Sequence, residues 1–396
     1  MPLTPGLSIM TTGHLSPPGG PVEPGGFDFR RHAWFQGLGA VGYTRVPVVA
    51  RAPPAAGDGL WLVGFRMSLS AALRERVPGG AGAFIAVIVA GDRSALPRDD
   101  IEALRHANLA HLLAISDLHM GLLTGTVFFA LRAGLAVIPG LALHWPIRKV
   151  AAVGALLAGA FYLALSGGNV ATVRAFVMAT VVLGAILVER RAFSFRTLAV
   201  AATLILVMSP EALTGPGFQM SFAATLGLIA VFGLIRDRGW TLSWPRWAAG
   251  AFAVVVSSAV AGAATAPFGA AHFNTVSDYG LLANLLSVPL MGLLVMPAAL
   301  IAFVLWPFGA EWLPLWVMQQ GVAWILFVAH WVAGHDGAVT RVPAPPPLVL
   351  PVFSLGALVV VLWQGAGRWL GLVPIAFAVL AWTTAERPFV LVSESG

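Results

Sequence analysis

The chain has 396 residues, of which 58% are hydrophobic and only 10% are charged. Because an ordinary soluble domain carries about a quarter charged residues, this composition excludes the soluble class and predicts a membrane protein. The sequence contains no cysteine, which excludes disulfide bonds and thiolate metal sites. The formal net charge of +6 would suit an anionic partner. Loop arginines that orient membrane helices are the simpler explanation of that charge.

Residues 1–60 differ from the rest of the chain because proline and glycine interrupt them repeatedly. We interpret this segment as the remnant of an extracytoplasmic β-rich domain. Within it, aromatic and cationic side chains alternate, and the candidate contacts to single-stranded nucleic acid are Arg30, Arg31, Trp34 and Phe35. The same mixture of side chains is also typical of an interfacial aromatic belt.

Residues 61–110 are predicted to form amphipathic helices that lie in the membrane interface. Phe65, Leu69, Leu73 and Val77 recur at helical spacing, and arginines occupy other positions on the same turns. A second apolar run over 83–90 is too short to cross a bilayer.

Residues 111–385 are predicted to form an all-α polytopic membrane domain with about ten spans, each needing roughly 20 apolar residues. The predicted spans are 111–139, 147–166, 169–188, 195–209, 217–235, 247–272, 279–306, 312–334, 347–364 and 368–385. Some spans are broken: Pro267 interrupts the sixth, and Pro289 and Pro297 interrupt the seventh. The seventh segment could therefore be one tilted span or two half-helices. Residues 386–396 are left as a C-terminal tail.

The loops predict the orientation of these spans. Positive residues follow the first, third and fifth spans, whereas the loops near Gly167, Glu211 and 272–278 contain no lysine or arginine. The positive-inside rule then places the ends of the odd-numbered spans in the cytoplasm, with Arg341 as an exception. With an even number of spans, both termini are predicted to lie outside the cytoplasm.

The start of the first span carries four polar candidates for a transport pathway, namely His111, Ser116, Asp117 and His119. Ionisable groups at membrane depth are functional candidates because they are costly to place there. On a straight helix the two histidines would lie about 12 Å apart along the axis, too far to share a metal ion. We therefore predict no metal site. The density of polar groups at the start of an apolar span instead predicts a helix break at the extracytoplasmic mouth of a pathway.

Further candidates lie within later spans. Arg174 stands inside the third span, with no carboxylate within four residues; it lines a polar pathway or snorkels to the interface. Gln219 and Ser221 in the fifth span, and Asn284 and Pro289 in the seventh, are candidate pathway residues. Polar side chains in spans also serve simply to hold helices together.

Several segments in order resemble the ComEC competence family. They are Gly91-Asp92-Arg93, the block from His111 to His119, Val173 to Met178, Pro216 to Phe222, and Asn284 to Pro289. The region from Gly19 to Tyr43 also resembles the last strands of that family's OB-like external domain. One departure is Asp117, which stands where the family usually has glycine. The family's first two spans, most of its OB-like domain and its metallo-β-lactamase-like domain have no counterpart here, as expected of a fragment or split version.

This resemblance implies an inner-membrane channel that carries single-stranded DNA into the cytoplasm, without enzymatic activity and without a cofactor. It implies a cytoplasmic helicase-type motor and an extracytoplasmic DNA receptor as partners, and leaves room for a separate nuclease and for a homo-oligomer. The alternatives are a secondary transporter of a small anion, with Arg174 as counter-charge, and a membrane hydrolase that uses Ser116 and His119.

Overall fold

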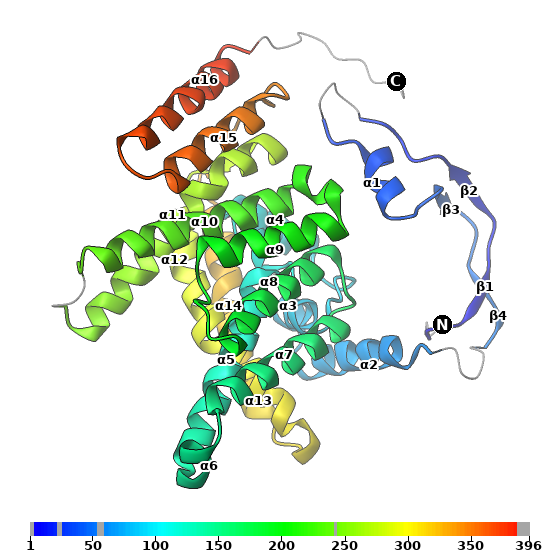
Figure 1. Cartoon of the computed structure of the whole chain (residues 1–396). Coiled ribbons are helices and arrows are strands. Elements are labelled where there is room, and N and C mark those ends of the chain that lie inside the picture. The colour runs from blue at the N-terminus through cyan, green and yellow to red at the C-terminus, as the bar shows by residue number, and fades with distance from the viewer. Residues whose placement is uncertain (1–3, 22–25, 54–58, 241–243, 386–396) are drawn as a thin grey trace. The chain divides into compact units, whose positions relative to one another are not determined.

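The computed structural model describes residues 4–21, 26–53, 59–240 and 244–385, so the predicted tail over 386–396 lies outside the described residues. The chain divides into two compact units, and Figure 1 labels their helices and strands. The larger unit comprises Leu62–Thr265 and Ser277–Thr340, and the smaller one Met1–Trp61, Ala266–Val276 and Arg341–Gly396.

Helices make up the larger unit. Its first half contains α2 (Trp61–Arg76), α3 (Gly79–Ala90), α4 (Arg98–His106), η1 (Ala110–Leu112), α5 (Asp117–Val137), α6 (Pro139–His144), α7 (Ile147–Leu165), α8 (Val170–Leu187), α9 (Phe195–Met208), η2 (Pro210–Thr214) and α10 (Pro216–Asp237). The second half contains most of α11 (Arg246–Phe273), then α12 (Gly280–Leu290), the π-turn η3 (Met291–Val295), α13 (Met296–Leu305), η4 (Trp306–Phe308) and α14 (Trp312–Ala333).

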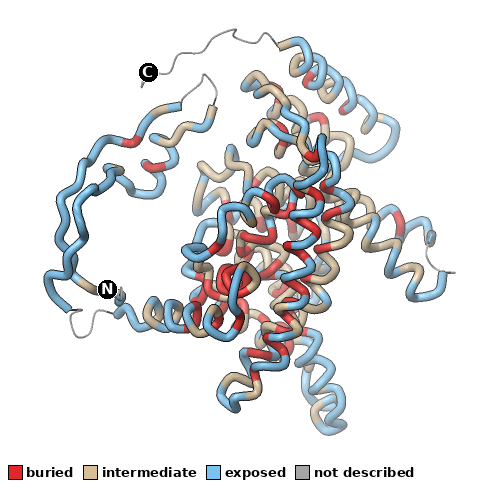
Figure 2. The backbone as a smooth tube through the Cα atoms, turned by 180° about the vertical axis from the view of Figure 1, so that it is seen from behind, coloured by how far each residue is buried: buried red, intermediate tan, exposed pale blue. Residues whose placement is uncertain are grey.

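The smaller unit contains short strands as well as helices. Its elements are β1 (Ser8–Met10), β2 (Gly13–Ser16), α1 (Phe29–Phe35), β3 (Val41–Thr44), β4 (Val49–Ala52), α15 (Val349–Leu362), η5 (Ala366–Gly371) and α16 (Leu372–Thr383). β1 pairs with β4 and β2 with β3, both antiparallel. A third short pair joins β5 (Thr275–Ser277) to β6 (Val339–Arg341). The residues of β1, β2 and β4 are exposed, whereas buried residues concentrate in the helices of the larger unit (Figure 2).

The predicted all-α polytopic membrane fold is confirmed. Among the described residues, eight helices are long and apolar enough to cross a membrane. The predicted fourth and ninth spans are also helices, α9 and α15, but each has only 14 residues. At 1.5 Å per residue such a helix covers about 21 Å, less than the hydrocarbon thickness of about 30 Å.

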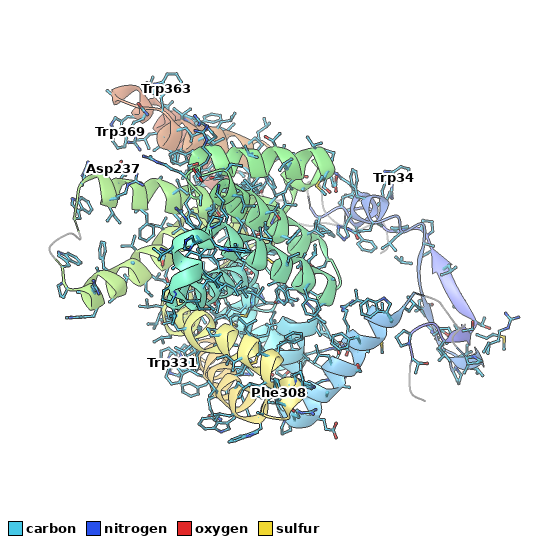
Figure 3. The ribbon with its side chains drawn as sticks, turned by 60° about the horizontal axis from the view of Figure 1, so that its bottom comes forward. Trp34, Asp237, Phe308, Trp331, Trp363 and Trp369 are labelled. Carbon is cyan, nitrogen blue, oxygen red and sulfur yellow. The ribbon has the colours of Figure 1, made fainter. Side chains whose placement is uncertain are left out.

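Exposed tryptophans mark both ends of α14. Trp312 opens this helix and is 68% exposed, and Trp331 near its end is 44% exposed. Figure 3 labels Trp331 near the end of α14 and Phe308 in the turn η4 that precedes this helix. The two tryptophans are about 28 Å apart along the helix axis, which matches a bilayer core bounded by aromatic belts.

The predicted start of the first span was wrong. α5 begins at Asp117 rather than at residue 111, and the residues before it form the short turn η1 followed by extended backbone at Ser116. Leu112, Leu113 and Ile115 in this stretch are buried in the protein. The error arose because apolar residues that pack inside the protein have the same hydropathy as residues that face lipid.

The segment predicted as the seventh span is one helical path with a break in its middle. Pro289 lies inside α12, the π-turn η3 follows directly, and α13 continues to the next turn. Proline removes one backbone donor and pushes away the carbonyl of the preceding turn. Next to this break, the Trp324 Nε1 group of α14 donates to the Leu286 carbonyl at 3.1 Å.

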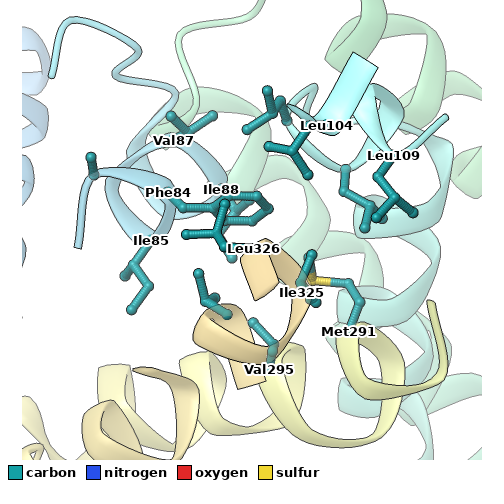
Figure 4. Close-up of a cluster of buried hydrophobic side chains, with 14 of the residues drawn as sticks. Phe84, Ile85, Val87, Ile88, Leu104, Leu109, Met291, Val295, Ile325 and Leu326 are labelled. Atoms are coloured by element: carbon teal, nitrogen blue, oxygen red, sulfur yellow. The ribbon is translucent and has the colours of Figure 1, made fainter. Parts of the chain in front are cut away.

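The core of the larger unit is built around α3. Phe84, Ile85 and Ile88 are no more than 1% exposed, and they pack with buried residues of α4, η3 and α14 (Figure 4). An interfacial helix needs one face in lipid, so the interfacial position predicted for 61–110 does not describe α3.

Arg66 connects α2 to the ends of two other helices. Its guanidinium donates to the carbonyl of Ala90, the last residue of α3, and to that of Ser166, which caps α7. Gly91 and Gly167 follow these carbonyls with φ of 71° and 85°, in the left-handed region that favours glycine. A Cβ on Gly167 would lie 2.4 Å from Arg66 Nη1, so the glycine also makes room for the arginine.

Candidate functional site

Three membrane helices of the larger unit meet at a polar cluster close to their N-termini. Asp117 is the first residue of α5, Arg174 lies in the second turn of α8, and Ser221 lies in the second turn of α10. We call these three side chains the charge cluster. They are separated by 57 and 104 residues along the chain, so helix packing brings them together.

The start of each helix is fixed by local sequence. Asn169 caps α8 by accepting from the Thr172 backbone N–H at 3.0 Å. Pro216 opens α10, where a missing N–H costs nothing. Gln219 donates to the Leu213 carbonyl at 3.0 Å and so ties the beginning of α10 to η2. Gln219 therefore lies near the charge cluster but makes this contact with the backbone.

The centre of the cluster is an ion pair. Arg174 Nη2 lies 3.2 Å from Asp117 Oδ2, and the Ser221 hydroxyl donates to the same carboxylate oxygen. The Arg174 side chain is 11% exposed and that of Asp117 is 25% exposed. A charge in such a position is costly to leave unpaired, which explains why each partner needs the other.

The ion pair leaves polar atoms unused. Asp117 Oδ1 and Arg174 Nε are both buried, and neither has a hydrogen-bond partner among the described residues. Gly217 of α10 lies against the guanidinium, because a Cβ there would be 2.7 Å from Arg174 Nη1. The Nε donor of Arg174 is therefore unused, and the guanidinium occupies the space beside Gly217 that a larger side chain would fill.

The two histidines of the predicted block lie in different environments. His119 is fully buried in α5; its Nδ1 lies 3.3 Å from Ser116 Oγ, and its Nε2 has no partner among the described residues. His111 is exposed in η1, where its Nδ1 lies 3.1 Å from the Asn108 carbonyl. The two do not share one straight helix as the spacing argument assumed, because the helical structure is broken between Leu113 and Ser116.

This geometry does not form a hydrolytic triad within the described part of the chain. A serine nucleophile needs a base that a third group orients. Ser116 and His119 are within contact distance, but among the described residues no carboxylate is hydrogen-bonded to His119: its Nε2 has no partner, and Asp117 Oδ2 accepts from Arg174 and Ser221. Over the same described residues, no group of three or more histidine, aspartate or glutamate side chains is arranged to hold a metal ion.

The remaining predicted pathway residues lie outside the charge cluster. Asn284 donates to the Gly280 carbonyl of its own helix at 2.7 Å, and Pro289 lies in α12 directly before the π-turn η3. Two residues before Pro289, the hydroxyl of Ser287 is buried and lacks a hydrogen-bond partner among the described residues.

The candidate nucleic-acid contacts of the N-terminal segment belong to the smaller unit. Arg30, Arg31, Trp34 and Phe35 lie on α1, which Asp28 caps through the Arg31 backbone N–H at 3.0 Å. Trp34 is 79% exposed and is labelled in Figure 3. A role of these residues in binding DNA stays a prediction.

The segment Gly91-Asp92-Arg93 has a structural role that the sequence did not show. Gly91 caps α3, and Asp92 accepts a hydrogen bond of 2.5 Å from the Ser70 hydroxyl of α2. Arg93 donates to the Leu113 carbonyl at 3.4 Å, in the break before α5. This segment thus connects α2 and α3 to the stretch that leads into the charge cluster.

Comparison with known proteins gives a family match over most of the chain. The model of the Competence protein family matches residues 88–367, a range that contains the whole charge cluster. ComE operon protein 3 of Bacillus subtilis (strain 168) is 24% identical over 356 residues, which are 89% of this chain and 43% of that protein.

A second similar protein is the uncharacterized protein YcaI of Escherichia coli (strain K12). It is 26% identical over 309 residues, which are 78% of this chain and 38% of that protein. The chain therefore spans less than half the length of either relative. No solved structure shows a significant match.

Proposed function

This chain belongs to the Competence protein family, and we propose that its larger unit forms part of a route by which single-stranded DNA crosses the bacterial inner membrane. The family match and the apolar helices make the chain a multi-pass inner-membrane protein. The proposal assigns it transport and no catalytic step.

The observation that carries the proposal is the charge cluster at the beginnings of α5, α8 and α10. A guanidinium is well suited to a phosphate because it is permanently charged and offers several N–H donors. The positive ends of three helix dipoles add to its attraction for an anion. The orientation predicted from the loop arginines places these helix starts on the extracytoplasmic side, where DNA would enter.

This sequence contains no P-loop or dinucleotide-binding fingerprint, so the proposal assigns the energy for transport to another protein. We therefore propose a cytoplasmic helicase-type motor and an extracytoplasmic DNA receptor as partners. A separate nuclease and a homo-oligomeric assembly are further parts of this proposal.

The test is transformation frequency in the native host, with the chromosomal gene replaced by variants. Arg174→Ala should abolish transformation, and Arg174→Lys should retain only part of it, because lysine keeps the charge but lacks the planar fork of donors. Arg191→Ala, which removes an exposed arginine between α8 and α9, is the matched control and should transform normally. Normal transformation by Arg174→Ala, at an unchanged protein level, would refute the role of this residue.

The break in the seventh predicted span favours one alternative, a secondary transporter of a small anion. Broken helices often line the substrate site of such transporters. α12, η3 and α13 provide this feature. Uptake of labelled inorganic phosphate or sulfate into proteoliposomes, lost in Arg174→Ala, would support this alternative if transformation were unaffected.

A further inference from the structure

We propose that Arg174 and Ser221 form an oxyanion site, that the carboxylate of Asp117 occupies this site at rest, and that a phosphodiester group of single-stranded DNA displaces the carboxylate during transport. The inference rests on the proposed function and specifies its ligand site. It makes Asp117 a built-in competitor of the transported strand.

The contacts of Asp117 are those expected of a stand-in for a phosphate oxygen. Its Oδ2 accepts from both the Arg174 guanidinium and the Ser221 hydroxyl. Carboxylate and phosphate oxygens accept the same charge-assisted hydrogen bonds from arginine. A phosphodiester oxygen placed at Oδ2 would therefore keep both of these donors.

The carboxylate uses the site incompletely. It engages Arg174 through one oxygen, while Asp117 Oδ1 and Arg174 Nε have no partner among the described residues. A phosphodiester has two unesterified oxygens, so it can use a second guanidinium donor that the carboxylate leaves idle. The absence of a side chain at Gly217 lets the guanidinium lie against α10, because a Cβ there would be 2.7 Å from Arg174 Nη1.

The two partners also differ in how easily they can move. The Arg174 side chain is 11% exposed, and that of Asp117 is 25% exposed. The arginine lies in the second turn of a long helix, whereas the aspartate is the first residue of its helix, next to extended backbone. Displacement of the aspartate therefore requires less rearrangement than displacement of the arginine.

A competing carboxylate suits a transport site. Conduction requires binding that is favourable enough for entry but weak enough for release. An uncompensated Arg174 would bind each phosphate tightly and slow the strand. Asp117 lowers that affinity, and it restores the ion pair when the strand has passed.

The test measures binding of a fluorescent oligothymidylate to the purified full chain by anisotropy, at one fixed salt concentration because such binding depends strongly on salt. Asp117→Asn should tighten binding about tenfold, the effect of removing one charge-assisted competitor. Arg174→Gln should weaken binding. In the Arg174→Gln background, Asp117→Asn should have no further effect, because the site that it frees is gone.

Glu189→Gln is the matched control for overall charge. Glu189 pairs with Lys149 at 2.8 Å on the exposed surface, so this change removes the same charge from another ion pair. The control should change the affinity less than twofold. If Glu189→Gln and Asp117→Asn raised the affinity for the oligonucleotide equally, net charge alone would explain the effect and the proposal would be overturned.

Inorganic phosphate and sulfate are measured as separate probes. A gain in affinity for these ions but not for the oligonucleotide would assign the site to a small anion and overturn the role in DNA binding. If Asp117→Asn does not fold, as judged by its tryptophan fluorescence, Asp117→Gly takes its place and must show the same tightening.

Failure of this inference can be told apart from failure of the proposed function. If Asp117→Asn binds the oligonucleotide like the wild type while transformation still depends on Arg174, the competitor role is wrong and the proposed function stands. If Arg174→Ala transforms normally, the proposed function has lost its main support, whatever the binding data show.

Discussion

α14 packs closely against the π-turn η3, so adding one methyl group to α14 at this contact should lower the stability of the protein. Gly321 of α14 lies against the π-turn η3, and a Cβ added to it would be 2.7 Å from Val295 Cγ2 and 3.2 Å from Leu294 Cδ2. Val295 is fully buried, and its short branched side chain cannot easily move away. Gly321→Ala should therefore overpack this contact.

Two opposing effects set the magnitude. Overpacking a filled core costs about 1–3 kcal/mol. Replacing glycine by alanine inside a helix gains about 1 kcal/mol from helix propensity. The net change for Gly321→Ala should therefore be about 0–2 kcal/mol of destabilisation. Gly184→Ala in α8 is the matched control, because a Cβ there meets nothing within 4 Å.

The assay is reversible unfolding of the purified chain in mixed micelles by SDS titration, followed by tryptophan fluorescence. Gly184→Ala should stabilise, and the difference between the two alanine variants, from which helix propensity cancels, should be about 1–3 kcal/mol. Val295→Ala in the Gly321→Ala background should recover part of the loss by removing the clashing methyl group. Equal stability of Gly321→Ala and Gly184→Ala would refute the packing argument.

Three further predictions concern other parts of the chain. Arg66→Met leaves the carbonyls of Ala90 and Ser166 without their donor, so it should lower the free energy of unfolding by about 2–3 kcal/mol in the same titration. Arg196→Met, at an exposed helix start, is the control and should change that free energy by less than about 0.5 kcal/mol. Burial tends to raise the pKa of Asp92, but hydrogen bonds from Ser70 and Ser94 outweigh it and lower that pKa. The resulting stability is present above the unfolded pKa of about 3.9 and is lost as the pH falls through the lower folded value, so wild type should lose more stability on acidification than Asp92→Asn. A C-terminal alkaline phosphatase fusion should be active and a C-terminal green fluorescent protein fusion dark; the reverse pattern would contradict the predicted orientation.

The membrane class could be predicted from the sequence because length and hydropathy alone determine it. A run of apolar residues that crosses a bilayer must be helical, so the predicted spans are found as helices even where their ends differ. Hydropathy does not distinguish an apolar residue that faces lipid from one that is buried inside the protein. For this reason α3, which is buried within the larger unit, was predicted to lie at the interface, and the buried residues before Asp117 were assigned to the first span.

The sequence was sufficient to select each member of the charge cluster as a candidate residue. It did not show that the three side chains contact one another. Asp117, Arg174 and Ser221 each stood out as a polar residue in an apolar segment. Arg174 has no carboxylate within four residues of it in the sequence, and its partner Asp117 is 57 residues away. One signal was available: the orientation predicted from the loops places two opposite charges at the same end of the first and third spans. Such charges are expected to pair when their helices are neighbours.

The position of the cluster at helix starts also bears on its charge balance. The ion pair of Asp117 and Arg174 has no net charge, but the N-termini of α5, α8 and α10 add partial positive charge around it. An anion is therefore favoured at this place whether it is a carboxylate or a phosphate. Removing Asp117 without supplying another anion leaves Arg174 and three helix dipoles uncompensated. The charge cluster therefore favours an anion: the aspartate supplies it in this structure, and under the proposed function a phosphate of the strand would take its place during transport.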